Sequence, residues 1–260
     1  MNEEILKEVT NQDYSSITKK IEDFLKYQVS ISKTNGVILG MSGGIDSAVI
    51  TFLCSRVLKE KTLVLVMPDS KISPNEETEE ALKIIDDLGI DYKLLDINLI
   101  VSEYSKYLEP NEHALGNLRA RVRANLLYYY ANSKNLLVVG SSDKSEFFIG
   151  YFTKFGDGSS DILPIVSLYK TQVRELARHL GVPESIIVKK SSPNLWLGHI
   201  AEEEIGVQYE EIDLILYCII DKKLSVEETV KTTNIDKNTV DKIYQLYKTS
   251  EHKRKTAAKL

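Results

Sequence analysis

Short apolar runs, each bounded by turn residues, recur in the first half of the chain at 36–40, 62–67, 92–97 and 136–139. Runs of this length and composition are typical of strands that are buried on both faces of a sheet. The segments between them, 45–59, 75–88 and 114–132, have the length and apolar spacing of helices. Repeated strand–helix units predict an α/β fold, a doubly wound parallel sheet flanked by helices, in which ligands bind at the carboxyl ends of the strands.

The rest of the chain has a helical pattern. Residues 1–35 are predicted to be amphipathic helix packed on a strand–helix core at 36–164. Residues 165–260 are predicted to be a helical C-terminal portion, interrupted by a Pro- and Gly-punctuated loop at 189–206. A chain of 260 residues with 43% hydrophobic residues is long enough for one such domain, and we expect a single domain over 1–260.

The net charge, the cysteines and the apolar runs of the chain indicate which kinds of partner it can bind. The formal net charge is -5, whereas proteins that bind nucleic acid usually carry an excess of Lys and Arg. Cys54 and Cys218 lie in apolar contexts and are interpreted as buried thiols in a reducing compartment. No apolar run approaches the length of a membrane span. We therefore expect a cytoplasmic protein with a small-molecule substrate and with neither nucleic acid nor a membrane as partner.

The first strand runs directly into a loop rich in Gly and Ser, which precedes a helix. The loop residues are Gly40, Met41, Ser42, Gly43, Gly44, Ile45, Asp46 and Ser47. Adjacent glycines allow backbone N–H groups to point at an anion, and the helix dipole adds partial positive charge. Because Asp46 would repel a phosphate, it predicts a Mg²⁺ ion between the carboxylate and a pyrophosphate. The alternative is a plain strand-to-helix turn without a ligand.

The string Ser-Gly-Gly-x-Asp-Ser at 42–47 resembles the PP-loop of the N-type ATP pyrophosphatases, which release pyrophosphate and transfer AMP. It lacks the lysine of a Walker A motif, so γ-phosphate transfer is not favoured. Several synthetases and tRNA-thiolating enzymes share this loop. A second segment, from Gly140 to Pro164, resembles the signature of the NAD synthetase family, and the likeness continues to Arg254. It covers nearly the whole chain from about residue 36.

This resemblance implies an adenine nucleotide alpha hydrolase-like fold and an amide-forming carbon–nitrogen ligase. ATP and Mg²⁺ activate the carboxylate of deamido-NAD as NAD-adenylate, and ammonia then displaces AMP to give NAD. Members that use glutamine add a long amidase domain, for which the residues before 36 leave no room. The ammonia-dependent members are therefore the expected group, and the resemblance implies a homodimer.

The resemblance also assigns residues around ATP. Ser141 follows the fourth strand and is predicted to contact ATP, as is Ser192; relatives usually carry Thr at both positions. Glu146 is predicted to bind Mg²⁺ together with Asp46, the alternative being a solvated carboxylate at a helix start. Lys170 opens a helix, where a cation is unfavourable unless it contacts something negative. The implied partner of Lys170 is the α-phosphate, and it is a predicted catalytic residue.

A second group of residues is assigned to deamido-NAD and ammonia. Asp157 is the candidate to orient ammonium and accept its proton, because the nucleophile must be neutral ammonia. The residues assigned to deamido-NAD are Arg121, Tyr128, Lys154, Asp161, His252 and Lys253. For the last two, composition alone would instead predict a frayed basic end.

Neighbouring residues receive weaker interpretations. Arg121 lies on the polar stripe of its helix, and Arg119 and Arg123 are interpreted as an exposed charged face on the other side. Trp196 is either a core aromatic or part of a lid over the nucleotide. His199 is interpreted as an ordinary loop histidine.

Two other classes of protein share parts of this pattern. A tRNA-thiolating PP-loop enzyme should have a basic RNA-binding region and a catalytic cysteine near the loop, which the acidic balance and the apolar cysteine contexts disfavour. A non-catalytic nucleotide sensor would retain the loop but has no reason to keep Asp46, Glu146, Asp157 and Lys170 together.

Overall fold

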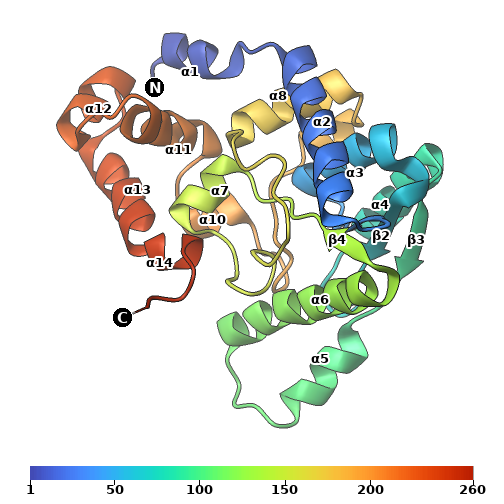
Figure 1. Ribbon diagram of the computed structural model, residues 1–260. Helices are drawn as coiled ribbons and strands as arrows, with labels where there is room; N and C mark the ends of the chain where they lie inside the picture. Colours follow the sequence, from blue (N-terminus) through green and yellow to red (C-terminus); the bar gives the residue numbers. More distant parts are fainter. Residues whose placement is uncertain (260) are drawn as a thin grey trace.

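Residues 1–259 are described by the computed structural model (Figure 1). Within them the strands form a parallel sheet in the order β3-β2-β1-β4. The strands are β1 (Gly36–Gly40), β2 (Thr62–Val66), β3 (Asp91–Leu94) and β4 (Leu136–Val138). The predicted parallel α/β sheet is confirmed, although β3 is shorter than its apolar run.

Helices cover both faces of the sheet. They are α2 (Tyr14–Ser32), α3 (Ile45–Leu58), α4 (Asn75–Leu88), α5 (Asn98–Ser105), α6 (Glu112–Lys134) and α8 (Lys170–Leu180). Side chains of β1 alternate between the faces, so Val37 and Leu39 pack with α2, α3, α4 and α8, whereas Ile38 packs with α5 and α6. This arrangement is the predicted doubly wound fold.

The carboxyl ends of the strands meet at one edge of the sheet. In β1, Ile38 pairs with Leu63 of β2 and with Val138 of β4. The loops that follow β1 and β4 therefore leave the sheet side by side. The helices that begin directly after these loops carry Asp46 and Glu146, which are 100 positions apart in the sequence (146 − 46).

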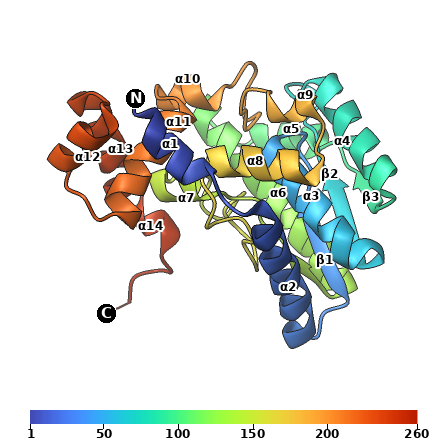
Figure 2. The same ribbon diagram turned by 90° about the horizontal axis from the view of Figure 1, so that it is seen from above.

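The C-terminal helices form a second packed group beside the sheet (Figure 2). They are α11 (Tyr209–Leu216), the π-helical segment η2 (Tyr217–Asp221), α12 (Val226–Thr233), α13 (Lys237–Thr249) and α14 (Glu251–Arg254). The shorter helices are α1 (Glu3–Thr10), η1 (Lys59–Lys61), α7 (Lys144–Ile149), α9 (Glu184–Ile187) and α10 (Ala201–Ile205). Helices α1 and α7 pack against this group as well, so it lies directly behind the helix that carries Glu146.

Both cysteines are free and buried, as the sequence predicted. Burial raises the pKa of the Cys54 thiol to about 12, which makes it unreactive. Among residues 1–259, no helix is long and apolar enough to cross a membrane. The single-domain organisation and the cytoplasmic location stay predictions.

Candidate active site

The glycine-rich loop joins β1 to the N-terminus of α3. Gly43 has a φ of +84°, and a Cβ at this position would lie 2.7 Å from the Glu77 carbonyl oxygen, so only glycine fits. Ser42 and Ser47 lie within the loop with their hydroxyl oxygens 3.2 Å apart. Gly44 is the N-cap of α3 and provides no side-chain cap, so the first N–H groups of the helix are available to an anion.

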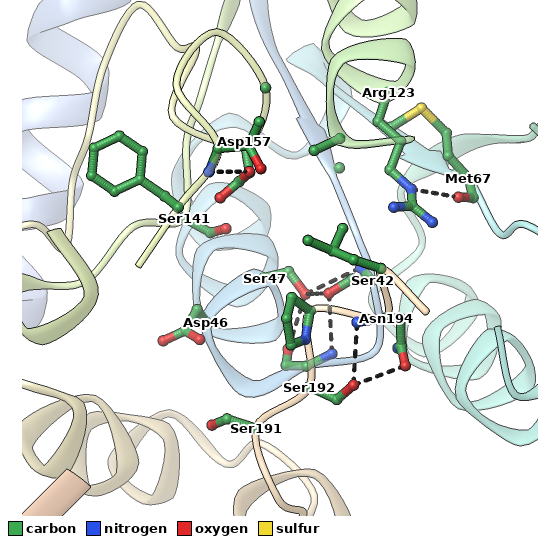
Figure 3. Close-up of a pocket in the computed structure, with 18 of the residues that line it drawn as sticks. Ser42, Asp46, Ser47, Met67, Arg123, Ser141, Asp157, Ser191, Ser192 and Asn194 are labelled. Carbon is green, nitrogen blue, oxygen red and sulfur yellow. Dashed lines mark hydrogen bonds between the residues drawn. The ribbon is translucent and has the colours of Figure 1, made fainter. Parts of the chain in front are cut away.

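This loop forms part of the wall of a cavity of about 430 Å³ (Figure 3). The cavity brings together most of the residues predicted to bind ATP. Those on its wall are Gly40, Met41, Ser42, Gly44, Ile45, Asp46, Ser47, Ser141 and Ser192. Of the remaining two, Gly43 lies against α4 and Lys170 is enclosed behind the wall.

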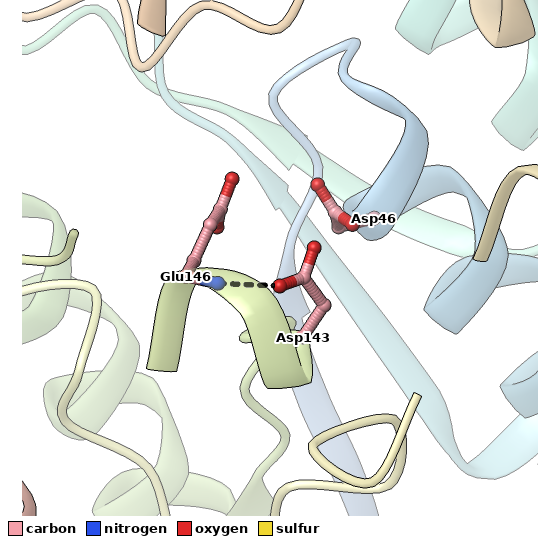
Figure 4. Close-up of side chains that lie close together, drawn as sticks. All are labelled: Asp46, Asp143 and Glu146. Atoms are coloured by element: carbon pink, nitrogen blue, oxygen red, sulfur yellow. Dashed lines mark hydrogen bonds between the residues drawn. The ribbon is translucent and has the colours of Figure 1, made fainter. Parts of the chain in front are cut away.

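Three carboxylates converge beside the loop. Asp46, Asp143 and Glu146 each offer an oxygen within 4.8 Å of the others (Figure 4). Asp46 comes from the start of α3, and Glu146 from the first turn of α7. Asp143 is the N-cap of α7, and its side chain accepts from the Glu146 N–H at 2.8 Å.

Lys170, the first residue of α8, lies among these carboxylates. Its Nζ lies 2.6 Å from Asp46 Oδ2 and 2.8 Å from both Asp143 Oδ2 and Glu146 Oε1. Burial opposes the charge of the ammonium, but the three carboxylates outweigh it and raise the pKa of Lys170 well above its ordinary value. The expectation that Lys170 contacts negative groups is thus confirmed, with carboxylates as the partners.

The cluster keeps an excess of negative charge when all its carboxylates are ionised. Three carboxylates and one ammonium sum to -2. Burial, reinforced by the neighbouring acids, raises the pKa of Asp46 and that of Asp143. A divalent cation would neutralise this excess and favour the ionised form of both carboxylates.

The oxygens of Asp46 and Glu146 fit such a cation. Lys170 holds Oδ2 of Asp46, while Oδ1 has no hydrogen-bond partner within residues 1–259. Glu146 Oε1 accepts from Lys170 and from the Tyr209 hydroxyl, which leaves Oε2 free of protein hydrogen bonds in the described part of the chain. Hard carboxylate oxygens are the ligands that Mg²⁺ prefers in proteins.

Asp157 lies on the cavity wall in the loop that follows α7. Its Oδ1 accepts from the Thr153 N–H at 3.0 Å. Burial by the surrounding loop raises the pKa of the carboxyl to about 6. The Asp157 side chain nevertheless remains exposed to the solvent of the cavity.

The predicted lid closes one side of the cavity and contains a polar network. The Trp196 and His199 rings stack with their centroids 3.5 Å apart, and both residues line the cavity. His199 Nε2 lies 2.7 Å from Glu204 Oε2, which also accepts from the Tyr151 hydroxyl at 2.6 Å. Trp196 therefore lines the cavity, and its role as part of a lid over the nucleotide stays a prediction. His199 is buried and hydrogen-bonded to Glu204, so it is not an ordinary loop histidine.

Helix α6 corrects one prediction. Arg119 and Arg123 do not form an exposed charged face. Arg119 is buried in an ion pair with Asp69, at 2.7 Å, and Arg123 donates to the Met67 carbonyl oxygen at 2.9 Å while it lines the cavity. Burial lowers the pKa of Arg123 to about 10. The prediction was that charged side chains on this side of the helix face solvent. It failed because Asp69 and the Met67 carbonyl oxygen, both just after β2, provide hydrogen-bond partners for these arginines inside the fold.

Most residues predicted to bind deamido-NAD lie beside the cavity rather than in it. Arg121 is exposed on α6 and donates to the Lys154 carbonyl oxygen at 3.3 Å. Lys154 Nζ donates to the His252 carbonyl oxygen at 2.7 Å. Tyr128 donates to Asp161 at 3.2 Å, and Asp161 also accepts from the backbone of β4. Arg121, Lys154 and His252 are thus linked to one another, and Tyr128 and Asp161 form a separate pair.

The C-terminal tail is anchored, in contrast to the frayed end that composition alone would predict. Lys253 Nζ donates to the carbonyl oxygens of Gly150 and Phe152, at 2.7 and 2.9 Å. Arg254 donates to the Phe148 carbonyl oxygen at 2.6 Å. Gly150 permits this approach, because a Cβ there would lie 2.1 Å from Ser250 Cβ. Lys253 therefore reaches the cavity wall, whereas His252 remains exposed.

Sequence reasoning missed Asp143 and Tyr209. The only local signal for Asp143 was its position three residues before Glu146, which suits an N-cap. Tyr209 gave no signal at all, because it contacts Glu146 from a helix that follows 63 positions later.

The parallel sheet, the glycine-rich loop at its carboxyl edge and the adjacent carboxylates define an α/β protein of the PP-loop class. The sequence model of the NAD synthase family matches residues 17–257. The chain belongs to the NAD synthase family.

Similar proteins agree with this assignment. The NH(3)-dependent NAD(+) synthetase of Hyperthermus butylicus is 51% identical over 96% of this chain and 91% of its own length. The structure of NMN synthetase from Francisella tularensis has a TM-score of 0.85 and 33% identity, covering 96% of this chain and 99% of its own. The NH3-dependent NAD synthetase of Campylobacter jejuni has a TM-score of 0.82 and 34% identity, covering 96% of this chain and 100% of its own.

Proposed function

We propose that the protein is an ammonia-dependent NAD synthetase, which uses ATP to amidate deamido-NAD through NAD-adenylate and releases AMP and pyrophosphate. One observation carries the proposal. The phosphate loop, the Asp46 and Glu146 carboxylates and the Asp157 carboxylate all line one cavity. Adenylation needs the first two, and amide formation by ammonia needs a base such as the third.

In this proposal the loop binds the phosphates of ATP through its backbone N–H groups and the hydroxyls of Ser42 and Ser47. Mg²⁺ would be held by Asp46 Oδ1 and Glu146 Oε2, and when bound it neutralises the charge of the departing pyrophosphate. Lys170 binds the other oxygen of each carboxylate, Asp46 Oδ2 and Glu146 Oε1. Its predicted contact with the α-phosphate stays a proposal, because the ammonium lies behind the carboxylates rather than on the cavity wall.

Product stoichiometry tests the proposed reaction. The full-length protein is incubated with ATP, Mg²⁺, ammonium and deamido-NAD, and we expect NAD, AMP and pyrophosphate in equal amounts. Because one similar structure is named NMN synthetase, nicotinate mononucleotide is the competing acceptor in a parallel assay. ADP and orthophosphate as products, or no turnover with either acceptor, would contradict the proposal. A tRNA-thiolating enzyme or a nucleotide sensor would give no NAD.

Lys253→Met tests the proposed contact between the tail and deamido-NAD. Loss of a cation that faces a pyrophosphate is expected to raise the KM for deamido-NAD about tenfold, roughly 1.4 kcal/mol, while the KM for ATP changes little. Removing residues 250–260 is a poorer test, because Ser250 and Arg254 also anchor α7. Lys255→Met is the control, since Lys255 is an exposed residue that pairs only with Glu251. An unchanged KM would remove Lys253 from the site.

We also propose a homodimer, which the resemblance implies. Helix α5 and the turn after it expose large apolar side chains, with Leu99 79% and Tyr107 80% accessible. Tyr92 and Leu94 are exposed on β3 at the edge of the described sheet. Replacing Leu99 and Tyr107 together by Glu is expected to give monomers in sedimentation equilibrium if α5 forms the interface. If the double variant still forms dimers at the same protein concentration as the wild type, α5 is not the interface.

A further inference from the structure

Helix α11 lies in the C-terminal group of helices, yet it reaches the carboxylate cluster from behind. Two of its side chains, Tyr209 and Asp213, are completely buried. They are four positions apart and so lie on the same face of the helix, one above the other. Neither lines the cavity.

Tyr209 forms a hydrogen bond with one carboxylate oxygen of Glu146. Its hydroxyl donates to Glu146 Oε1 at 2.8 Å, and the same oxygen accepts from Lys170 Nζ at 2.8 Å. The Tyr209 ring also lies 5.0 Å from Lys170 Nζ. Two donors on one oxygen fix the plane of the carboxylate, so the second oxygen, Oε2, keeps a single orientation.

Asp213 forms hydrogen bonds with the residues next to Glu146 and Lys170. Its carboxylate accepts from the Ser145 hydroxyl and from the Thr171 N–H, the latter at 2.8 Å. Ser145 Oγ in turn accepts from the Lys170 N–H at 2.9 Å. The Asp213 carboxylate therefore links Ser145, the residue before Glu146, to the first two residues of α8. Its negative charge also interacts favourably with the positive N-terminal end of the α8 dipole.

We infer that Tyr209 and Asp213 are positioning residues, which hold Glu146 and Lys170 so that Glu146 Oε2 and Asp46 Oδ1 together form a preorganised site for a divalent cation. The inference rests on the metal site of the proposed function. It assigns part of that site to α11, whose residues touch neither the cation nor the substrates. An ordinary structural role for the same hydrogen bonds would change the stability of the protein but not its affinity for a cation.

Tyr209→Phe is the main test, because it removes one hydroxyl and keeps the ring. Mn²⁺ is the probe, and its binding to the full-length protein is measured by electron paramagnetic resonance without substrates. We expect the Kd for Mn²⁺ to rise roughly tenfold, since loss of a partner that orients a metal ligand typically costs that much affinity or more. The Mg²⁺ concentration for half-maximal pyrophosphate release should rise by the same factor, with an unchanged KM for deamido-NAD.

Tyr217→Phe is the matched control. The Tyr217 hydroxyl donates to Glu8 Oε1 at 2.8 Å, so the substitution removes the same kind of bond at the same length. Tyr217 follows directly after α11 but does not contact the cluster. We expect wild-type Mn²⁺ affinity in this variant.

Asp213→Asn is the second variant, since the amide keeps the shape but cannot accept on both sides. It should also weaken Mn²⁺ binding, and thermal unfolding recorded alongside identifies the folded fraction. If Tyr209→Phe and Asp213→Asn lower the melting temperature but bind Mn²⁺ as the wild type does, both residues are only structural and the inference is overturned. If the wild-type protein itself binds no Mn²⁺, the metal site of the proposed function fails, and the inference with it.

Discussion

Asp46→Asn is expected to lower the rate of pyrophosphate release about a thousandfold, which corresponds to about 4 kcal/mol of lost transition-state stabilisation. The substitution removes the charge that faces the cavity but keeps the shape of the side chain. Lys170 keeps Asp143 and Glu146 as counter-charges, so the fold should survive. The rate is measured at saturating ATP and deamido-NAD over a range of Mg²⁺ concentrations, with circular dichroism as the check on folding.

Glu146→Gln should produce a loss of similar size, because it removes the second proposed ligand. Asp236→Asn is the matched control, since Asp236 only caps α13, where Asn caps equally well. If either Asp46→Asn or Glu146→Gln were fully active at ordinary Mg²⁺, the proposed metal ligands would be wrong.

Asp157→Asn is expected to slow amide formation by roughly a hundredfold or more while adenylation continues at a similar rate. The reason is that an amide cannot accept the proton of ammonium, whereas the ATP-binding wall is unchanged. Rapid-quench experiments should show accumulated NAD-adenylate. Raising the pH should partly restore the rate, because it supplies neutral ammonia directly.

The pH profile gives a second measurement on Asp157. Burial raises the pKa of this carboxyl to about 6, so the group is mostly protonated below that pH and mostly ionised above it. Only the ionised form accepts a proton, so amide formation in the wild type should fall as the pH drops through about 6. The Asn variant should lose the break near pH 6, which is the acidic limb due to Asp157, and its rate should instead follow the supply of neutral ammonia across the whole pH range.

Asp161→Asn provides the contrast within the same loop. Asp161 does not line the cavity and accepts from Tyr128 and from the Val138 N–H, so its substitution should act on the KM for deamido-NAD and leave the acidic limb in place. Equal losses of adenylation and amide formation in Asp157→Asn, without rescue at high pH, would move Asp157 to a substrate-positioning role.

The fold and the phosphate loop were predictable because their signals are local. Strand and helix follow from apolar periods within a few residues, and the loop at 40–47 lies between one strand and one helix. A parallel sheet brings the carboxyl ends of its strands to one edge, and the family resemblance assigned Asp46 and Glu146 to one metal ion. The strand order, in which β1 and β4 are neighbours, was known only from the tertiary structure.

The tertiary structure decided how each charge is satisfied. Lys170 meets Asp46 across 124 positions, and Arg119 meets Asp69 across 50, so no window of sequence reveals either pair. For Arg119 and Arg123, the sequence identified a charged face of α6, but only the packed sheet edge showed that Arg119 is buried and that Arg123 lines the cavity. A buried charge is stable only beside its partner, and the chain's path through space, which local sequence does not encode, determines which partner that is.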